Sequence, residues 1–167
     1  YEANKKNHKL ALGKPRNIRA WTHGGGGPSH NLGNLAFSAE GKFSSHFKVK
    51  VGSKGTYSEP IFQNNKIFMM TPNGYIVVYN DEGQFLWELN ILPEEIVVKT
   101  DLYGGLAINK DRLAVTTSLG ELLLISVSKK KIVWRYDFKR PFRSAPIIHK
   151  GYIYGVTGDD IAISLDI

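Results

Sequence analysis

The sequence predicts an all-β fold built from short antiparallel strands. Apolar, β-branched and aromatic residues occur in runs of four to six, and turn-forming residues separate the runs. No segment carries a sustained helical period. The runs are apolar on both faces, which is typical of strands that lie between two neighbouring sheets. These observations favour small sheets stacked face to face.

An internal repeat has the period of a β-propeller blade. Thr71, Thr117 and Thr157 recur at intervals of 46 and 40 residues, and Trp87 and Trp134 at an interval of 47. A period of about 40 to 50 residues is that of a propeller blade or a helical array, and the strand-sized runs favour the blade. We therefore expect a partial β-propeller of four-stranded antiparallel blades.

The first repeat shows the four predicted strands of a blade. Its runs lie at residues 60–63, 66–71, 75–80 and 85–90. Gly74 and Gly120 stand in the turn before the third strand of their blades, and Trp87 and Trp134 lie in the fourth strand. These four residues are predicted to be the structural signature of the blade, with the large indoles packed between blades.

The domain organisation is predicted in two parts. We expect a flexible basic and Gly-rich leader at residues 1–34 and propeller blades at residues 35–167. The blade region is expected to contain the isolated fourth strand of a closing blade at 46–51, blades at 58–91 and 104–138, and an incomplete blade at 144–167. About two and a half blades cannot close a ring, and they expose an unpaired edge. The sequence is interpreted as the N-terminal part of a longer propeller; the alternative is a small open sheet protein that assembles with a partner.

Composition excludes several classes of site. The chain of 167 residues has no cysteine, which excludes disulfides, thiol catalysis and Cys-based metal sites. No apolar run reaches the roughly 18 residues of a membrane span, and residues 1–19 lack the apolar region of a signal peptide. The net charge is +7, partly from the tail and partly from residues 129–143. We interpret both groups as solvated charge, with no nucleic-acid partner.

Catalytic and metal-binding motifs are missing from the sequence. "HGGGG" at residues 23–27 is similar to an oxyanion-hole loop, but no G-x-S-x-G elbow accompanies it, and we interpret it as a mobile linker. No Walker A motif occurs, and the five histidines lack metal-ligand spacing. Asp159 and Asp160 lie where turn chemistry favours Asp, with a calcium site as the alternative. The sequence predicts no catalytic residue, no metal and no cofactor.

Several segments resemble a known family. The Trp after a turn, "SAP" at residues 144–146 and the Gly that begins the third strand resemble the PQQ-like, quinoprotein-type propeller repeat. The following stretches are similar to the leader and early blades of bacterial BamB-type lipoproteins: "WTHGGGGPSHNLGNL" at 21–35, "YGGLAINKDRLAVTTSLGELLLI" at 103–125 and "PFRSAPIIHKGYIYGVTGDDIAISLD" at 141–166. The resemblance covers residues 21–167.

This resemblance implies an eight-bladed, non-enzymatic scaffold on the periplasmic side of the outer membrane, anchored by a lipid outside this segment. The scaffold binds the POTRA region of BamA and assists insertion of β-barrel proteins. In the family, an apolar residue and an Arg before an "SAP" strand contact BamA; Phe142 and Arg143 stand there in this sequence, without the family's extra residues between Arg and Ser. We expect both on an exposed rim, with Lys139 and Arg140 steering an acidic partner. The alternative, which the sequence leaves open, is that Phe142 caps the blade and Arg143 pairs with a nearby acid.

Two other functions stay open from the sequence. One is a fragment of a PQQ-dependent dehydrogenase, which needs an acidic and amide calcium set and a catalytic Asp; neither is visible in these residues. The other is a propeller that binds glycans or the cell wall. Binding of PQQ distinguishes the first from a scaffold, and binding to a glycan array distinguishes the second.

Overall fold

The computed structural model describes residues 13–36, 47–51, 58–93 and 101–167. Within these ranges the chain forms eleven β-strands and no helix, and the strands make three antiparallel sheets. The predicted all-β fold of four-stranded blades is confirmed. No helix in the described part of the chain is long and apolar enough to cross a membrane.

The first sheet follows the four runs predicted from the sequence. Its strands are paired in chain order and are β1 (Ile61–Gln63), β2 (Lys66–Met70), β3 (Tyr75–Asn80) and β4 (Phe85–Asn90). Asn64 and Asn65 form the turn between β1 and β2, with φ angles of 50° and 58°. Asn tolerates positive φ better than most other residues, and two such residues make the tight hairpin turn.

The second sheet is the most deeply buried part of the molecule. Its strands, also paired in chain order, are β5 (Gly104–Asn109), β6 (Arg112–Thr117), β7 (Glu121–Ser126) and β8 (Lys131–Asp137). Every residue of β7 is buried, and so is every residue of β6 except Arg112. Both faces of these strands are covered because a sheet lies on each side, as the apolar runs predicted.

The third sheet has three strands and buries one face. It contains β9 (Ile147–His149), β10 (Tyr152–Val156) and β11 (Ala162–Asp166), with β10 in the middle. Along β10, Ile153 and Gly155 are buried, whereas Tyr152, Tyr154 and Val156 are exposed. This alternation shows that a neighbouring sheet covers one face of β10 only.

Residues 47–51 form no strand, contrary to the prediction for 46–51; residue 46 lies outside the described residues. The side chains from Phe47 to Val51 do alternate between partly buried and exposed, as in an extended strand. A strand also needs a hydrogen-bonded neighbour, and none of the described strands pairs with this segment. Phe47 packs instead on Gly83, whose missing side chain leaves room for the ring.

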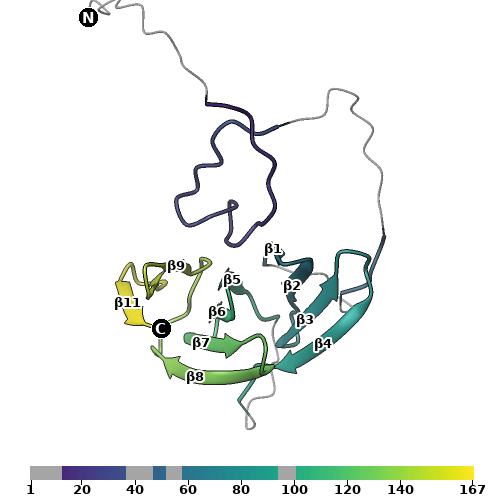
Figure 1. Cartoon of the computed structure of the whole chain (residues 1–167). Coiled ribbons are helices and arrows are strands. Elements are labelled where there is room, and N and C mark those ends of the chain that lie inside the picture. Colours follow the sequence, from purple (N-terminus) through teal and green to yellow (C-terminus); the bar gives the residue numbers. More distant parts are fainter. Residues whose placement is uncertain (1–12, 37–46, 52–57, 94–100) are drawn as a thin grey trace, which may run out of the picture.

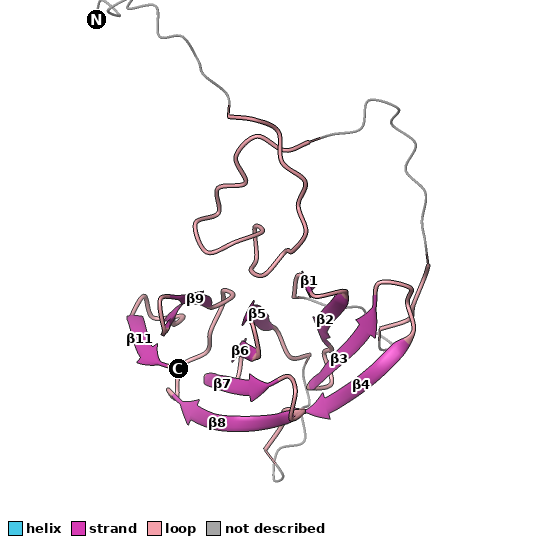
Figure 2. Ribbon diagram, viewed as in Figure 1, coloured by secondary structure: helices cyan, strands magenta, loops and turns pink. Residues whose placement is uncertain are grey.

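The three sheets stand side by side, each with its first strand nearest the leader (Figure 1). We call β1, β5 and β9 the inner strands; β4 and β8 form the outer rim (Figure 2). Apolar clusters fill the spaces between the sheets. Between the first and second sheets lie, among others, Phe68, Trp87 and Leu106, and between the second and third sheets Leu124, Phe142 and Ile153.

The leader is held across the inner strands. Trp21 and Phe62 exchange two backbone hydrogen bonds of 2.7 Å, and the N–H of Ile108 donates to the carbonyl of Thr22 at 2.8 Å. The backbone of Trp21 and Thr22 is therefore bound to the otherwise unpaired inner edges of β1 and β5. The mobile linker expected at residues 23–27 stays a prediction. The N-terminal tail, including Lys5, Lys6 and Lys9, lies outside the described residues.

Candidate partner-binding site

The loop between β8 and β9 carries the two residues predicted to contact a partner, Phe142 and Arg143. Phe142 is fully buried, with 0% of its surface exposed. Its ring lies edge-on to Phe138, with the centroids 5.5 Å apart, and packs against Gly155. The expectation of an exposed Phe142 is therefore wrong. The ring fills the space between the second and third sheets, where a glycine leaves room for it.

Hydrogen bonds hold the loop on both sides of Arg143. The N–H of Phe142 donates to the carbonyl of Thr117 at 3.1 Å. The carbonyl of Ser144 accepts a hydrogen bond of 2.7 Å from the hydroxyl of Thr116. Both partners belong to the end of β6, so the backbone that carries Arg143 is fixed to the second sheet.

Arg143 differs from the other cations of the loop in its pairing. Lys139 Nζ lies 2.5 Å from Asp137 Oδ2, and Arg140 Nε lies 3.0 Å from Asp159 Oδ2. Arg143 is exposed and makes no ion pair with another described residue. Pairing within the chain weakens the long-range field that Lys139 and Arg140 offer to an acidic partner.

The aspartates of these two pairs are held in the ionised form. Hydrogen bonds from Lys139 lower the pKa of Asp137, and the same contact raises the pKa of Lys139. The pKa of Asp159 is lowered chiefly by a hydrogen bond from the hydroxyl of Thr157, 2.6 Å away. Both ion pairs therefore persist in mildly acidic solution, although exposed pairs of this kind contribute little to stability.

The β8–β9 loop presents the Arg143 side chain to solvent from a backbone that is bound to the second sheet. The guanidinium of Arg143 offers a planar fork of donors that fits a carboxylate or a pair of backbone carbonyls. Its backbone is already held in place, so less conformational entropy is lost when a partner binds. Phe142 is the buried anchor of the loop, and Arg143 is an exposed cation beside it.

The four blade-signature residues lie at equivalent places in the first two sheets. Trp87 is 8% exposed and lies edge-on to Phe68, and Trp134 packs beside the second apolar cluster. Gly74 and Gly120 have φ angles of 82° and 93° in the turns before β3 and β7. A Cβ on Gly120 would lie 2.8 Å from a backbone nitrogen of the β8–β9 loop. The turn geometry thus requires glycine and brings the loop close to β7.

Residues 72–167 match the family described as "Outer membrane protein assembly factor BamB". The chain belongs to this BamB family. The matched region begins in the turn after β2 and includes the second sheet, the third sheet and the β8–β9 loop. No curated protein sequence matches the chain.

Solved structures share the fold. BamB from Moraxella catarrhalis has a TM-score of 0.51 and 14% identity, over 66% of this chain and 33% of that one. A quinohemoprotein alcohol dehydrogenase from Pseudomonas putida HK5 has a TM-score of 0.55 and 15% identity, over 67% of this chain and 19% of that one. The computationally designed Ika8 protein has a TM-score of 0.54 and 14% identity, over 65% of this chain and 32% of that one. The chain thus spans about a fifth to a third of these proteins, and the likeness is one of fold.

Sequence reasoning missed an ion pair within the second blade of this BamB-family chain, whose arginine also makes a hydrogen bond to the first blade. Arg135 of β8 contacts the carboxylate of Glu121 in β7, and its Nη2 donates to the carbonyl of Ile91 at 2.8 Å. Glu121 is 5% exposed, and its Oε2 has no hydrogen-bond partner among the described residues. The charge pattern of β8 gave no hint of this pair, because Ile91 belongs to the preceding blade.

Sequence reasoning also missed the burial of His23. Only 2% of its surface is exposed, and its Nε2 accepts a hydrogen bond of 3.0 Å from the N–H of Ile148. The four glycines that follow suggested mobility instead. His149 is exposed, as its place in a predicted turn suggested. His30 is also exposed, and His8 and His46 lie outside the described residues.

The described residues contain no group of three His, Cys, Asp or Glu that could hold a metal ion. Asp159 accepts a hydrogen bond from the hydroxyl of Thr157 and pairs with Arg140, so its carboxylate is already engaged. Asp160 has a φ of 66° in the β10–β11 turn, the position that glycine occupies in the other two sheets. These contacts account for both aspartates as turn residues.

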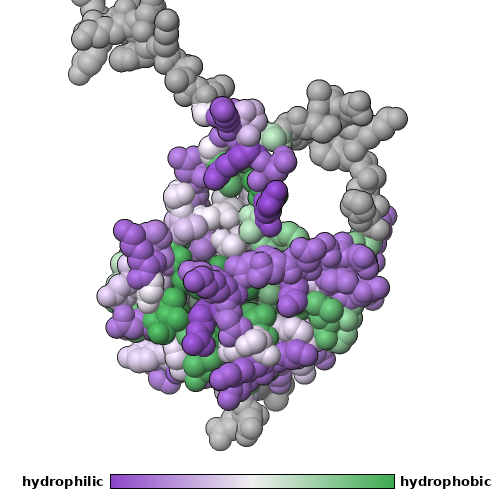
Figure 3. All heavy atoms as spheres, in the orientation of Figure 1, coloured by the Kyte–Doolittle hydropathy of each residue, from purple (hydrophilic) through white to green (hydrophobic). Residues whose placement is uncertain are grey.

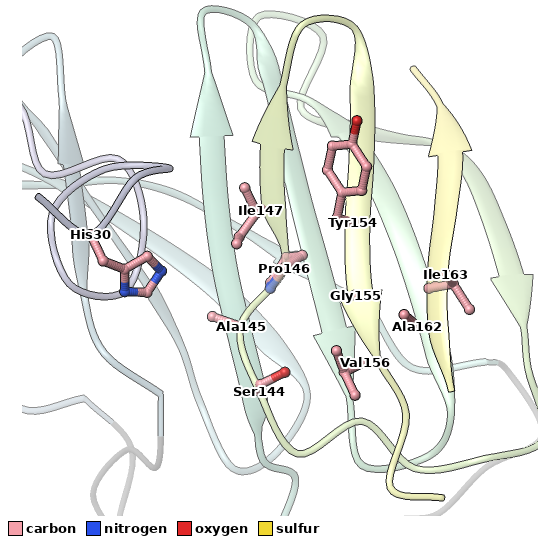
Figure 4. A pocket seen from close by; sticks show the side chains of 11 residues that line it. His30, Ser144, Ala145, Pro146, Ile147, Tyr154, Gly155, Val156, Ala162 and Ile163 are labelled. Atoms are coloured by element: carbon pink, nitrogen blue, oxygen red, sulfur yellow. The ribbon is translucent and has the colours of Figure 1, made fainter. Parts of the chain in front are cut away.

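A hollow of about 370 Å³ lies on the open face of the third sheet (Figure 4). Tyr154 and Ala162 line it from the sheet, and His30 reaches it from the leader. The corresponding face of the second sheet is covered by the third. In the space-filling view, apolar side chains reach the surface among hydrophilic ones (Figure 3).

Proposed function

We propose that this chain is part of a non-enzymatic scaffold that acts on the periplasmic side of the outer membrane. It binds the POTRA region of BamA and thereby assists insertion of β-barrel proteins. The match of residues 72–167 to the BamB family carries this proposal. The proposed contact loop lies inside the matched residues.

Arg143 is the proposed contact residue, and Phe142 is its support. An exposed guanidinium on a fixed backbone suits recognition of acidic or carbonyl groups on a partner. The buried Phe142 ring cannot add contact area without leaving the apolar cluster. This revises the pair expected from the sequence into one contact residue and one anchor.

The alternative function is that of a PQQ-dependent dehydrogenase. The fold that the chain shares with a quinohemoprotein alcohol dehydrogenase favours it. Incubation with PQQ and calcium, followed by desalting, separates the two functions. A scaffold retains no quinone absorbance, whereas retained absorbance with a fixed stoichiometry supports the dehydrogenase.

Titration calorimetry with the purified POTRA region of BamA tests the scaffold proposal. We expect saturable binding with one defined stoichiometry. An unrelated acidic protein of similar size is the control for non-specific attraction to the basic chain. Absence of binding, or equal binding of the control protein, would contradict the proposal.

A further inference from the structure

The leader joins the inner strands of all three sheets within three consecutive residues. Trp21 pairs with β1, and the carbonyl of Thr22 accepts the N–H of Ile108 in β5. His23 reaches the third sheet, where its Nε2 accepts the N–H of Ile148 in β9 at 3.0 Å. His23 is the only one of the three that makes its contact through a side chain that titrates near neutral pH.

The hydrogen bonds of His23 require a neutral ring. Because Nε2 accepts from a backbone N–H, the ring proton must lie on Nδ1, which is 2.8 Å from the hydroxyl of Thr22. Protonation of Nε2 would place two N–H groups against each other and bury a positive charge at a site that is 2% exposed. The docked leader is therefore compatible with one protonation state only.

The surroundings of His23 oppose its protonation. Burial is the largest cause that lowers the pKa of His23 from its ordinary value. The N–H of Ile148 can only donate, so its hydrogen bond to Nε2 also favours the neutral ring. His30 on the leader and His149 on β9 lower it further. Before β1, the carboxylate of Glu59 accepts the N–H of Gly25 at 3.3 Å. The inner strand β5 presents no charged side chain at the His23 contact, where Ala107 lies opposite.

We propose that His23 is a pH-sensitive latch that fastens leader residues 21–26 across the inner strands and releases them when the ring is protonated. The released leader binds more protons than the docked one, so docking is strongest above pH 6.5 and weakens as the pH falls below it. One coupled proton allows a loss of up to about tenfold in the docking constant per pH unit. The latch is independent of the proposed binding of BamA.

Amide hydrogen exchange between pH 8 and pH 5, corrected for the intrinsic pH dependence, tests the latch. The N–H groups of Phe62, Ile108 and Ile148 report on the docked leader, and Leu123 in the buried β7 is the internal reference. We expect the three reporters to lose protection together below about pH 6.5 while Leu123 keeps its protection. Constant protection of the three reporters across this range would overturn the proposal.

Two variants separate the latch from general acid sensitivity. In His23→Gln the amide oxygen can still accept from Ile148, and it does not titrate, so protection should become independent of pH. His149→Gln removes an exposed histidine of β9 but leaves His23 in place. Protection should therefore still be lost at low pH, with a midpoint slightly above that of the wild type, because His149 no longer opposes protonation of His23. If His23→Gln docks poorly at every pH, nitrogen NMR of the His23 ring in the wild type decides. Ring protonation must then coincide with the loss of protection at Ile148, and a mismatch of the two midpoints would refute the latch.

Discussion

The Phe142 ring stands edge-on to the Phe138 ring, with the centroids 5.5 Å apart and the planes at 88°. This geometry is a favourable one for aromatic pairs. It places an aromatic side chain from the β8–β9 loop inside the core between two blades. The loop is consequently part of the blade interface, and the exposed Arg143 directly follows a residue that is buried in the core.

Replacement of Phe142 should destabilise the whole fold and not only the β8–β9 loop. Phe142→Ala removes a fully buried ring and should lower the free energy of unfolding by about 3 to 5 kcal/mol. Phe85 is 56% exposed, and Phe85→Ala is the matched control with an expected loss of about 0.5 to 1 kcal/mol. Urea unfolding measures both. Equal small losses for the two variants would show that Phe142 is not an anchor.

The Arg135–Glu121 pair should behave as a buried ion pair. Arg135→Met leaves the Glu121 carboxylate buried without its cation. The free energy of unfolding should fall by about 3 kcal/mol. This is the low end of the range for buried ion pairs, because 25% of the Arg135 side chain is exposed. The double variant Arg135→Met/Glu121→Leu should recover to within about 1 kcal/mol of the wild type. A double variant as unstable as the sum of its two single variants would contradict this account.

Two glycines with similar φ angles offer a test of close packing at the β8–β9 loop. Gly120 and Gly151 have φ angles of 93° and 87°, but a Cβ on Gly120 would meet loop backbone at 2.8 Å, whereas one on Gly151 would meet nothing within 4 Å. Gly151→Ala should cost about 1 kcal/mol from backbone strain, and Gly120→Ala about 2 to 3 kcal/mol. Thermal unfolding compares the two. Equal losses of stability for the two variants would mean that the loop does not pack closely against the turn before β7.

The blades were predictable because their signals are local. The runs at 75–80 and 85–90 coincide with β3 and β4. Turns such as Asn64–Asn65 need only their own backbone angles, which Asn and Gly supply. The repeat then identified the second and third sheets, since each unit carries the same pattern of strands and turns.

The sequence left the burial of Phe142 as one of two alternatives and did not predict that of His23, because distant residues decide both. Phe142 stands in a loop rich in cations, which suggests exposure, and the space that it fills depends on Gly155 in another sheet. His23 meets Ile148, 125 residues further along the chain. Residues 47–51 show the opposite case, where the strand pattern is present but none of the described strands pairs with it.

The proposed scaffold role is tested most directly by titrating the POTRA region of BamA into the wild type and into Arg143→Glu. The account predicts a loss of at least about 2 kcal/mol in binding free energy, roughly a thirtyfold rise in Kd, with an unchanged melting temperature. Lys129→Glu makes the same change of charge on an exposed residue of the turn between β7 and β8, at the other end of the blade, and should bind like the wild type. Equal affinities for Arg143→Glu and Lys129→Glu, or an affinity loss that follows a lowered melting temperature, would contradict the account.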